Sequence, residues 1–133
     1  MKQRRYREGI EVLETVIREM PRNAIAHYNL GRAYINVGNL DDAQRMLETA
    51  LHINPHIKEI YFNLSRVFQE KGDVEQAKRY CHDALKLDEN YTKAKEYLNF
   101  LTQIRYTAAI DLELIQKALQ NFDHNNTEFM IKL

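Results

Sequence analysis

The sequence contains a single cysteine, Cys81, among its 133 residues. One cysteine excludes an intrachain disulfide. A chain without disulfides is typical of a reducing compartment, so the cytoplasm is the expected location. If the chain is an excerpt of a longer protein, segments outside it would set that location instead.

The charges show no excess of one sign, because 19 lysine and arginine residues balance 19 aspartate and glutamate residues. A balanced chain has no bulk attraction for nucleic acid or for an anionic membrane. The basic stretch 2–7 is interpreted as a solvated helix start. No apolar run reaches the length of a membrane span. Neither nucleic acid nor a membrane is therefore an expected partner.

The motifs of catalysis are missing as well. The sequence has no glycine-rich phosphate loop, no His-Glu-x-x-His run and no nucleophile elbow. His52 and His56 have a spacing that suits a metal on one helix face, but Pro55 lies between them and ends the helix. We therefore expect no enzyme activity, no catalytic residue, no metal site and no cofactor.

What the sequence does contain is a repeat of 34 residues. Pro21 recurs as Pro55, and Gly38 recurs as Gly72. An alanine followed by leucine recurs at the same interval, at Ala50, Ala84 and Ala118. A fixed period of this length indicates a solenoid, in which each unit buries its apolar face against its neighbours.

Each unit predicts two helices joined by a tight turn. In residues 24–57, apolar side chains recur with a period near 3.6 up to residue 37, which indicates an amphipathic helix. Gly38 is expected to end this helix, because glycine enters the left-handed conformation without steric cost. Asn39 and Asp41 are candidates for the N-cap of the second helix, which stops before Pro55.

The unit 58–91 repeats this pattern with the same small residues at the expected helix crossing. Gly31 recurs as Ser65 on the first helix. Cys81 occupies the core position of Leu47, so we expect its thiol to be buried rather than reactive.

These positions resemble the tetratricopeptide repeat family. The residues that carry the resemblance in one unit are Leu30, Gly31, Tyr34, Gly38, Ala43, Leu47, Ala50 and Pro55. In the next unit they are Leu64, Ser65, Phe68, Gly72, Ala77, Cys81 and Ala84. The departures are His27 and Tyr61, where the family often has tryptophan, and Glu89 in place of the closing proline. The resemblance implies an all-α fold, a right-handed α-solenoid of antiparallel helix–turn–helix hairpins in one domain over residues 1–133.

The flanking segments are predicted to belong to the same array. Residues 3–22 match the second helix of a repeat whose first helix is absent. Residues 92–125 match a degenerate repeat or capping helices, and a single long bent helix over 92–122 is the alternative because no glycine marks a turn there. Residues 126–133 are expected to form a tail.

A second helix without its first leaves an apolar edge at one end of the array, whereas repeat arrays normally finish with polar caps. We hypothesise that the chain is either an excerpt of a longer repeat protein or a homo-oligomer through the array ends.

The resemblance also implies a concave groove that is lined by the first helix of each hairpin and holds a peptide or helix of a partner protein. The residues carried over to this groove are Tyr28, Asn29, Arg32, Asn36, Phe62, Asn63, Arg66, Gln69 and Lys93. Glu59 is on the same face. An aromatic row (Tyr28 and Phe62) and a basic row (Arg32 and Arg66) suit a partner with acidic and apolar side chains.

Three narrower interpretations remain beside this one. Asn29 and Asn63 could form a ladder that holds a ligand backbone, although asparagine is also common at this repeat position. Some family members clamp the terminal carboxylate of chaperone tails, but only Asn63 and Lys93 match among five clamp positions, so we do not expect that type of co-chaperone. A differently built anion site that uses Arg32, Arg66 and Lys93 stays open. Arg66 could instead form an ordinary ion pair with Glu70.

Two functions therefore compete. The first is a protein–protein interaction scaffold that binds a partner segment in the groove. The second is a structural or self-assembling repeat segment of a larger protein, without a ligand of its own.

Overall fold

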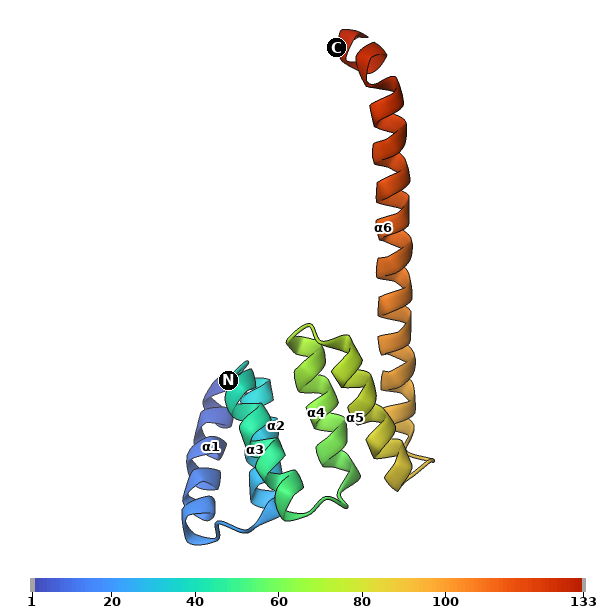
Figure 1. Cartoon of the computed structure of the whole chain (residues 1–133). Helices are drawn as coiled ribbons and strands as arrows, with labels where there is room; N and C mark the ends of the chain where they lie inside the picture. The colour runs from blue at the N-terminus through green and yellow to red at the C-terminus, as the bar shows by residue number, and fades with distance from the viewer. Residues whose placement is uncertain (1, 133) are drawn as a thin grey trace. The chain divides into compact units, whose positions relative to one another are not determined.

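The computed structural model describes the backbone of residues 2–132 and the side chains of residues 4–104 and 112–121. The chain folds into the helices α1 (Lys2–Glu19), α2 (Ala24–Asn36), α3 (Leu40–Ile53), α4 (Lys58–Glu70), α5 (Val74–Leu87) and α6 (Thr92–Lys132), labelled in Figure 1. It divides into two compact units, Met1–Asn99 and Phe100–Leu133.

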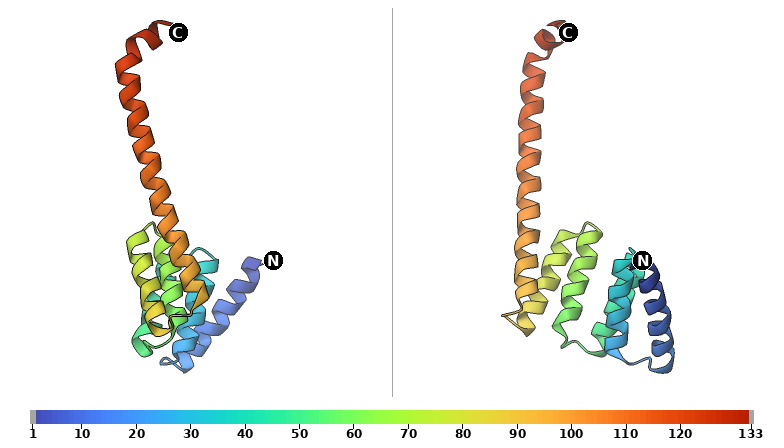
Figure 2. Two further views of the ribbon diagram at one scale, coloured as in Figure 1. Left: turned by 90° about the vertical axis from the view of Figure 1, so that its right-hand side faces the viewer. Right: turned by 180° about the vertical axis from the view of Figure 1, so that it is seen from behind.

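The first unit is a stack of helical hairpins. Helix α2 packs against α3, and α4 packs against α5, as Figure 2 shows from two further sides. Helix α1 packs against α2, and α3 packs against α4, so neighbours in the chain are neighbours in the stack. The fold is the all-α solenoid of antiparallel hairpins that the resemblance implied.

Glycine makes both hairpin turns, as expected. Gly38 has φ +81° and Gly72 has φ +88°, in the left-handed region that other residues rarely adopt. After Gly38, the N–H of Asn39 donates to the carbonyl of Tyr34 at 2.9 Å, which satisfies a carbonyl at the end of α2.

The equivalent helices α3 and α5 are capped in different ways at their starts. Asp73 accepts a hydrogen bond from the N–H of Gln76 at the start of α5. Asn39 occupies the N-cap of α3, but its amide donates to Asp42 instead of accepting from the backbone. Asp41 was the wrong choice for a cap, because α3 begins one residue earlier and places Asp41 inside the first turn.

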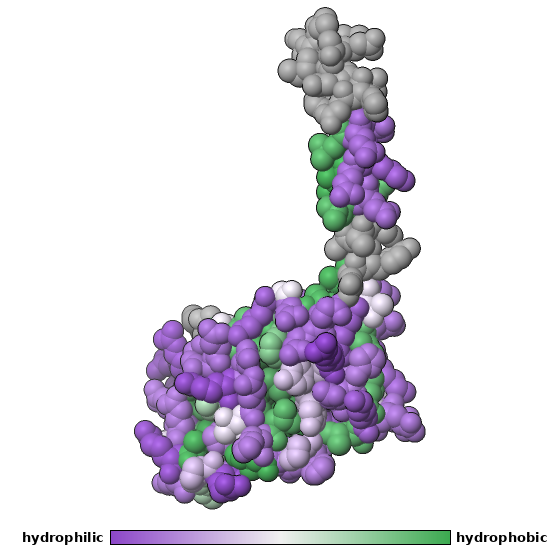
Figure 3. Space-filling view, viewed as in Figure 1, coloured by the Kyte–Doolittle hydropathy of each residue, from purple (hydrophilic) through white to green (hydrophobic). Residues whose placement is uncertain are grey.

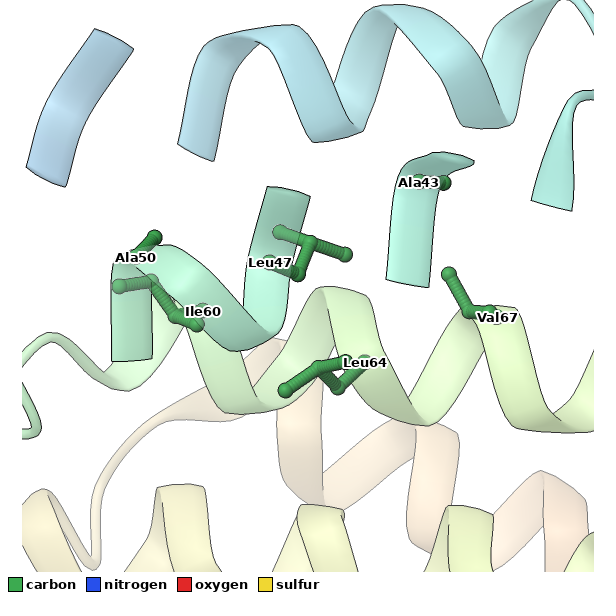
Figure 4. Close-up of a cluster of buried hydrophobic side chains, with 6 residues drawn as sticks. All are labelled: Ala43, Leu47, Ala50, Ile60, Leu64 and Val67. Carbon is green, nitrogen blue, oxygen red and sulfur yellow. The ribbon is translucent and has the colours of Figure 1, made fainter. Parts of the chain in front are cut away.

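The core lies where the hairpins cross. Its fully buried apolar side chains come from α3 and α4 and are drawn in Figure 4: Ala43, Leu47, Ala50, Ile60, Leu64 and Val67. Gly31 of α2 faces this cluster, and a Cβ atom at Gly31 would lie 2.7 Å from Cγ of Leu47. The small residue therefore allows α2 and α3 to approach closely.

In the second hairpin, α4 crosses α5 at the equivalent position, where Ser65 stands in place of Gly31. The Ser65 hydroxyl donates to the carbonyl of Ala77 at 2.7 Å and lies 3.0 Å from Sγ of Cys81. Cys81 is fully buried, which confirms the expected core position. Burial raises the pKa of the Cys81 thiol, so the reactive thiolate is disfavoured.

Residues 92–122 were open to two interpretations, a pair of helices or one long helix. In the structure they form one helix. Helix α6 runs without a break from Thr92 to Lys132, through the segment 126–132 that we expected to form a tail. Tyr106 stands where the earlier units have Gly38 and Gly72. Because a tyrosine pays a steric cost in the left-handed conformation, the chain continues as a helix at this point. The assignment of 92–125 as a degenerate repeat stays a prediction.

In the second unit, apolar side chains gather on the described part of α6. Four of them are more than half exposed: Leu112, Leu114, Ile115 and Leu119. Figure 3 shows this apolar surface on the segment, beside polar side chains. Within the described residues, no helix combines the length and the apolar character that crossing a membrane requires.

Candidate functional site

A cavity of about 160 Å³ lies on the first unit at the face formed by α2 and α4. Its lining residues come from α2, from α4, from the residue before α6 and from the start of α6: Tyr28, Arg32, Glu59, Phe62, Asn63, Arg66, Tyr91 and Lys93. Equivalent repeat positions meet here because α2 and α4 are the first helices of adjacent hairpins and contact each other. Residues that are 34 positions apart in the sequence therefore lie side by side in the structure.

Six of the nine residues assigned to the groove from sequence line this cavity. The other three are Asn29, Asn36 and Gln69. Asn29 is half-buried and Asn36 is exposed, both on α2. Gln69 accepts a hydrogen bond from the Tyr97 hydroxyl at 3.1 Å.

Arg32 lies against an aromatic ring of its own helix. Its guanidinium carbon is 5.5 Å from the centre of the Tyr28 ring, within the range of a cation–π contact. Burial raises the pKa of the Tyr28 hydroxyl, so this group remains a hydrogen-bond donor at neutral pH.

Asn63 lies between the two repeats and is almost completely buried. Its amide nitrogen donates to the carbonyl of Glu59 at 2.8 Å and approaches the Tyr28 hydroxyl at 3.5 Å. Its oxygen accepts from Arg66 at 3.0 Å. The amide therefore has partners on both of its polar atoms before any ligand arrives.

The hydrogen bond from Arg66 to Asn63 replaces the ion pair that the sequence suggested. Among the described residues, the ion pairs of the structure do not include one between Arg66 and Glu70. Arg66 lines the cavity, and the four other N–H groups of its guanidinium remain for other partners.

An aromatic wall closes one side of the cavity. The Phe62 ring centre is 5.8 Å from that of Tyr91 and 5.5 Å from that of Tyr97, both in edge-to-face geometry. Lys58 lies over the Tyr91 ring at 4.9 Å and pairs with Asp88, which anchors the loop before α6. Burial raises the pKa of Tyr91 to about 12.

Tyr91 is the lining residue that the sequence analysis missed. It lies one residue before α6, outside the helix positions from which the groove was assigned. The sequence feature that could have identified Tyr91 is its position. It is an aromatic residue directly before the first helix of a repeat frame, and it is equivalent to Ile57. Such a residue reaches the groove because the loop returns the chain to the face of α4.

The cavity is positive overall. Arg32, Arg66 and Lys93 carry positive charge, and Glu59 is the one carboxylate in the lining. Within the described part of the chain, these three cations take part in none of the ion pairs. A pocket with two arginine forks outside those ion pairs and a tyrosine hydroxyl is suited to bind an anion.

The described residues were also compared with the donor sets that hold metal ions. They contain no group of three histidine, cysteine, aspartate or glutamate side chains that could hold a metal ion. His27 is buried and bonds to the carbonyl of Pro21 at 2.9 Å, which ties α2 to the loop before it.

The 34-residue repeat is that of a known protein family. A family model described as "Tetratricopeptide repeat" matches residues 1–56 and 38–104. No curated protein matches the sequence.

Solved structures show the same fold at low sequence identity. The first TPR of Spaghetti (RPAP3), bound to the HSP90 peptide SRMEEVD, superposes with a TM-score of 0.74 at 22% identity, over 79% of this chain and 83% of that chain. The first TPR domain of human RPAP3 gives a TM-score of 0.75 at 22% identity, over 80% and 84% of the two chains. An O-GlcNAc transferase mutant of Thermobaculum terrenum gives 0.67 at 27% identity, over 69% of this chain but only 18% of that chain.

Proposed function

Because the chain belongs to the tetratricopeptide repeat family, we propose that it is a protein-interaction module without catalytic activity of its own. Its first unit binds an acidic segment of a partner protein in the cavity between α2 and α4. The observation that carries this proposal is the convergence of three cations, Arg32, Arg66 and Lys93, none of which has an anionic partner within the described residues.

The two arginines are held in place before binding. Arg66 is fixed by Asn63, and Arg32 rests on the Tyr28 ring. A side chain that is already ordered loses less entropy when it binds, which favours affinity. Phe62 and Tyr91 supply an apolar surface beside the cations, so an apolar side chain next to the acidic one would add buried area.

A structural neighbour supports the class of partner. The first TPR of Spaghetti binds the peptide SRMEEVD, which has three acidic residues. We propose a different set of contacts for this chain. Asn63 has its polar atoms occupied, so it braces Arg66 rather than holding the ligand, and the arginines take the main contacts.

The proposal is tested with two mixed-sequence peptide libraries, one of acidic and apolar residues and one of basic and apolar residues. The full chain is immobilised and the retained peptides are quantified by mass spectrometry. We expect retention of the acidic library and its loss in the variant Arg32→Glu/Arg66→Glu. The matched control is Arg22→Glu/Arg79→Glu, at two exposed arginines outside the cavity lining.

Equal retention of the two libraries would contradict an acidic partner. Loss of acidic peptides in both charge-reversed variants would show that net charge, not the cavity, governs retention. Circular dichroism of each variant checks that the helices are retained.

The alternative is a structural segment that assembles with copies of itself. The exposed apolar side chains of α6, such as Leu112, Ile115 and Leu119, favour it. The molar mass in solution separates the two functions. A mass that rises with concentration above the 15.8 kDa of one chain would support assembly. A mass that stays constant would contradict assembly and favour the binding module.

A further inference from the structure

We infer that the acidic group which this cavity takes is a phosphoryl group on a side chain of the partner segment. The inference rests on the proposed function, since it specifies the ligand of the same site. It follows from the charge, the size and the donor arrangement of the cavity.

The net positive charge of the lining favours a ligand with two negative charges. Three cations face one carboxylate, that of Glu59, so the lining has more positive charge than a single ligand carboxylate can neutralise. A phosphorylated side chain brings about −1.5 to −2 charges in one compact group at neutral pH.

The size of the cavity favours one compact group over two acidic side chains. Its volume of about 160 Å³ is well below the roughly 300–1,000 Å³ of a site for a drug-sized ligand. A phosphoryl group concentrates its charge and its three acceptor oxygens in one place, whereas two carboxylates need two side chains and two stems.

The donors are arranged to meet several acceptor oxygens at once. Arg32 and Arg66 enter from adjacent repeats, and each offers a planar fork of the kind that binds phosphate in a bidentate manner. The Tyr28 hydroxyl lies within reach of the Asn63 amide and can accept its hydrogen bond, which leaves the phenolic hydrogen free for a ligand.

Glu59 weakens the binding of every anion, because its carboxylate lies in the same lining. Both the attraction by the cations and the repulsion by Glu59 grow in proportion to the charge of the ligand. Because three cations outweigh one carboxylate, a dianion gains about twice the net attraction of a monoanion.

The test uses three mixed-flank peptide libraries that differ only in the central residue: serine, phosphoserine or glutamate. Both peptide ends are blocked, so that no terminal carboxylate competes. The full chain is immobilised, and retention is measured at about pH 5.5 and about pH 7.5, on either side of the second phosphate pKa near 6. The titratable and charged groups in the lining are Tyr28, Arg32, Glu59, Arg66, Tyr91 and Lys93, and no histidine is among them.

We expect the phosphoserine library to be retained about tenfold more strongly than the glutamate library, a difference of about 1.4 kcal/mol. Its retention should rise from the lower to the higher pH, while that of the glutamate library stays nearly constant. The variant Arg32→Glu/Arg66→Glu should lose the phosphoserine library, and Arg22→Glu/Arg79→Glu should keep it.

Equal retention of the phosphoserine and glutamate libraries, or a phosphoserine signal that does not change with pH, would overturn the inference and leave the proposed function standing. Retention of none of the three libraries would overturn both. Inorganic phosphate is added as a competitor to separate the phosphoryl group from its peptide. If it binds as tightly as the phosphopeptides, the peptide part of the inference is wrong.

Discussion

At the scale of single residues, the site depends on how each arginine is held. Arg66 is fixed by the hydrogen bond that it donates to Asn63, one turn earlier in its own helix, and Arg32 is fixed by an aromatic ring. Both supports come from residues of the same helix as the arginine they hold, Asn63 and Tyr28. The arrangement is therefore local, and single substitutions can test it.

We predict that Asn63→Ala weakens binding of the acidic library by about fivefold, or ~1 kcal/mol, because Arg66 loses its support. The matched variant is Asn29→Ala, at the equivalent position of the preceding repeat but outside the cavity lining. It should change binding much less. Equal losses in the two variants would instead favour a ladder of asparagines that holds the ligand backbone.

A second prediction at this scale concerns the glycine at the helix crossing. Gly31→Ala should lower the free energy of unfolding by about 1–3 kcal/mol, because its Cβ would meet the fully buried Leu47. Gly9→Ala is the matched control, since nothing lies within 4 Å of a Cβ there. In a helix it should stabilise by about 0.5–1 kcal/mol.

Urea unfolding followed by circular dichroism measures both variants. If Gly31→Ala were as stable as the wild type, the close approach of α2 to α3 would not be needed for the fold.

Six of the residues that line the cavity were assigned to the groove from the sequence. The resemblance to the tetratricopeptide repeat family assigned these residues to the groove, and the 34-residue period paired Arg32 with Arg66 and Tyr28 with Phe62. The bonds of Asn63 could not be assigned in this way, since they depend on rotamers and on the burial of neighbouring groups. Tyr91 was missed because a loop, whose course the period does not fix, carries it.

At the scale of the helices, local rules decided where each element ends. Gly38 and Gly72 make the turns that their sequence position predicted. The same rule explains the length of α6. At the repeat position where a glycine would make a turn, the chain has Tyr106, and the helix continues. Periodicity alone left both interpretations of this segment open, because a hairpin and one long helix share the same apolar spacing.

The contact of α1 with α2 predicts a dependence of stability on high pH. The Tyr34 hydroxyl donates to Glu14 of α1 at 3.0 Å, and burial, reinforced by this carboxylate, raises the pKa of Tyr34 to about 12. Burial also raises the pKa of Tyr91 and of Tyr97 to about 12.

An acid whose pKa is raised by folding keeps a proton that the unfolded chain releases. The stability from these tyrosines is therefore complete below the unfolded value near 10 and is lost as the pH rises from about 10 to about 12. Urea unfolding at several alkaline pH values should show this fall, and Tyr34→Phe should make it shallower. A stability that stays constant across this range would contradict the assignment.

At the scale of the whole molecule, we assign recognition to the first unit. The chain has no net charge, yet its cavity gathers three cations around one carboxylate. Charge balance over the full sequence therefore predicted little about the partner, because the local arrangement of charges determines what binds.

This local arrangement predicts a response to salt. Binding of the acidic library should weaken severalfold when the salt concentration rises from about 0.05 M to about 0.5 M, because the cations are accessible and ions screen them. Isothermal titration with a single retained peptide measures the change. An affinity that does not depend on salt would point to an apolar contact, such as that offered by Phe62 and Tyr91, as the main source of binding.

The most direct test of the central claim is to locate bound peptide on the full chain by NMR. Backbone amide shifts are followed while a retained acidic peptide is added. The account predicts that the largest shifts fall on α2, on α4 and at residues 91–93, where the lining residues lie. Shifts concentrated on α1, or on the exposed apolar residues 112–119 of α6, would contradict it.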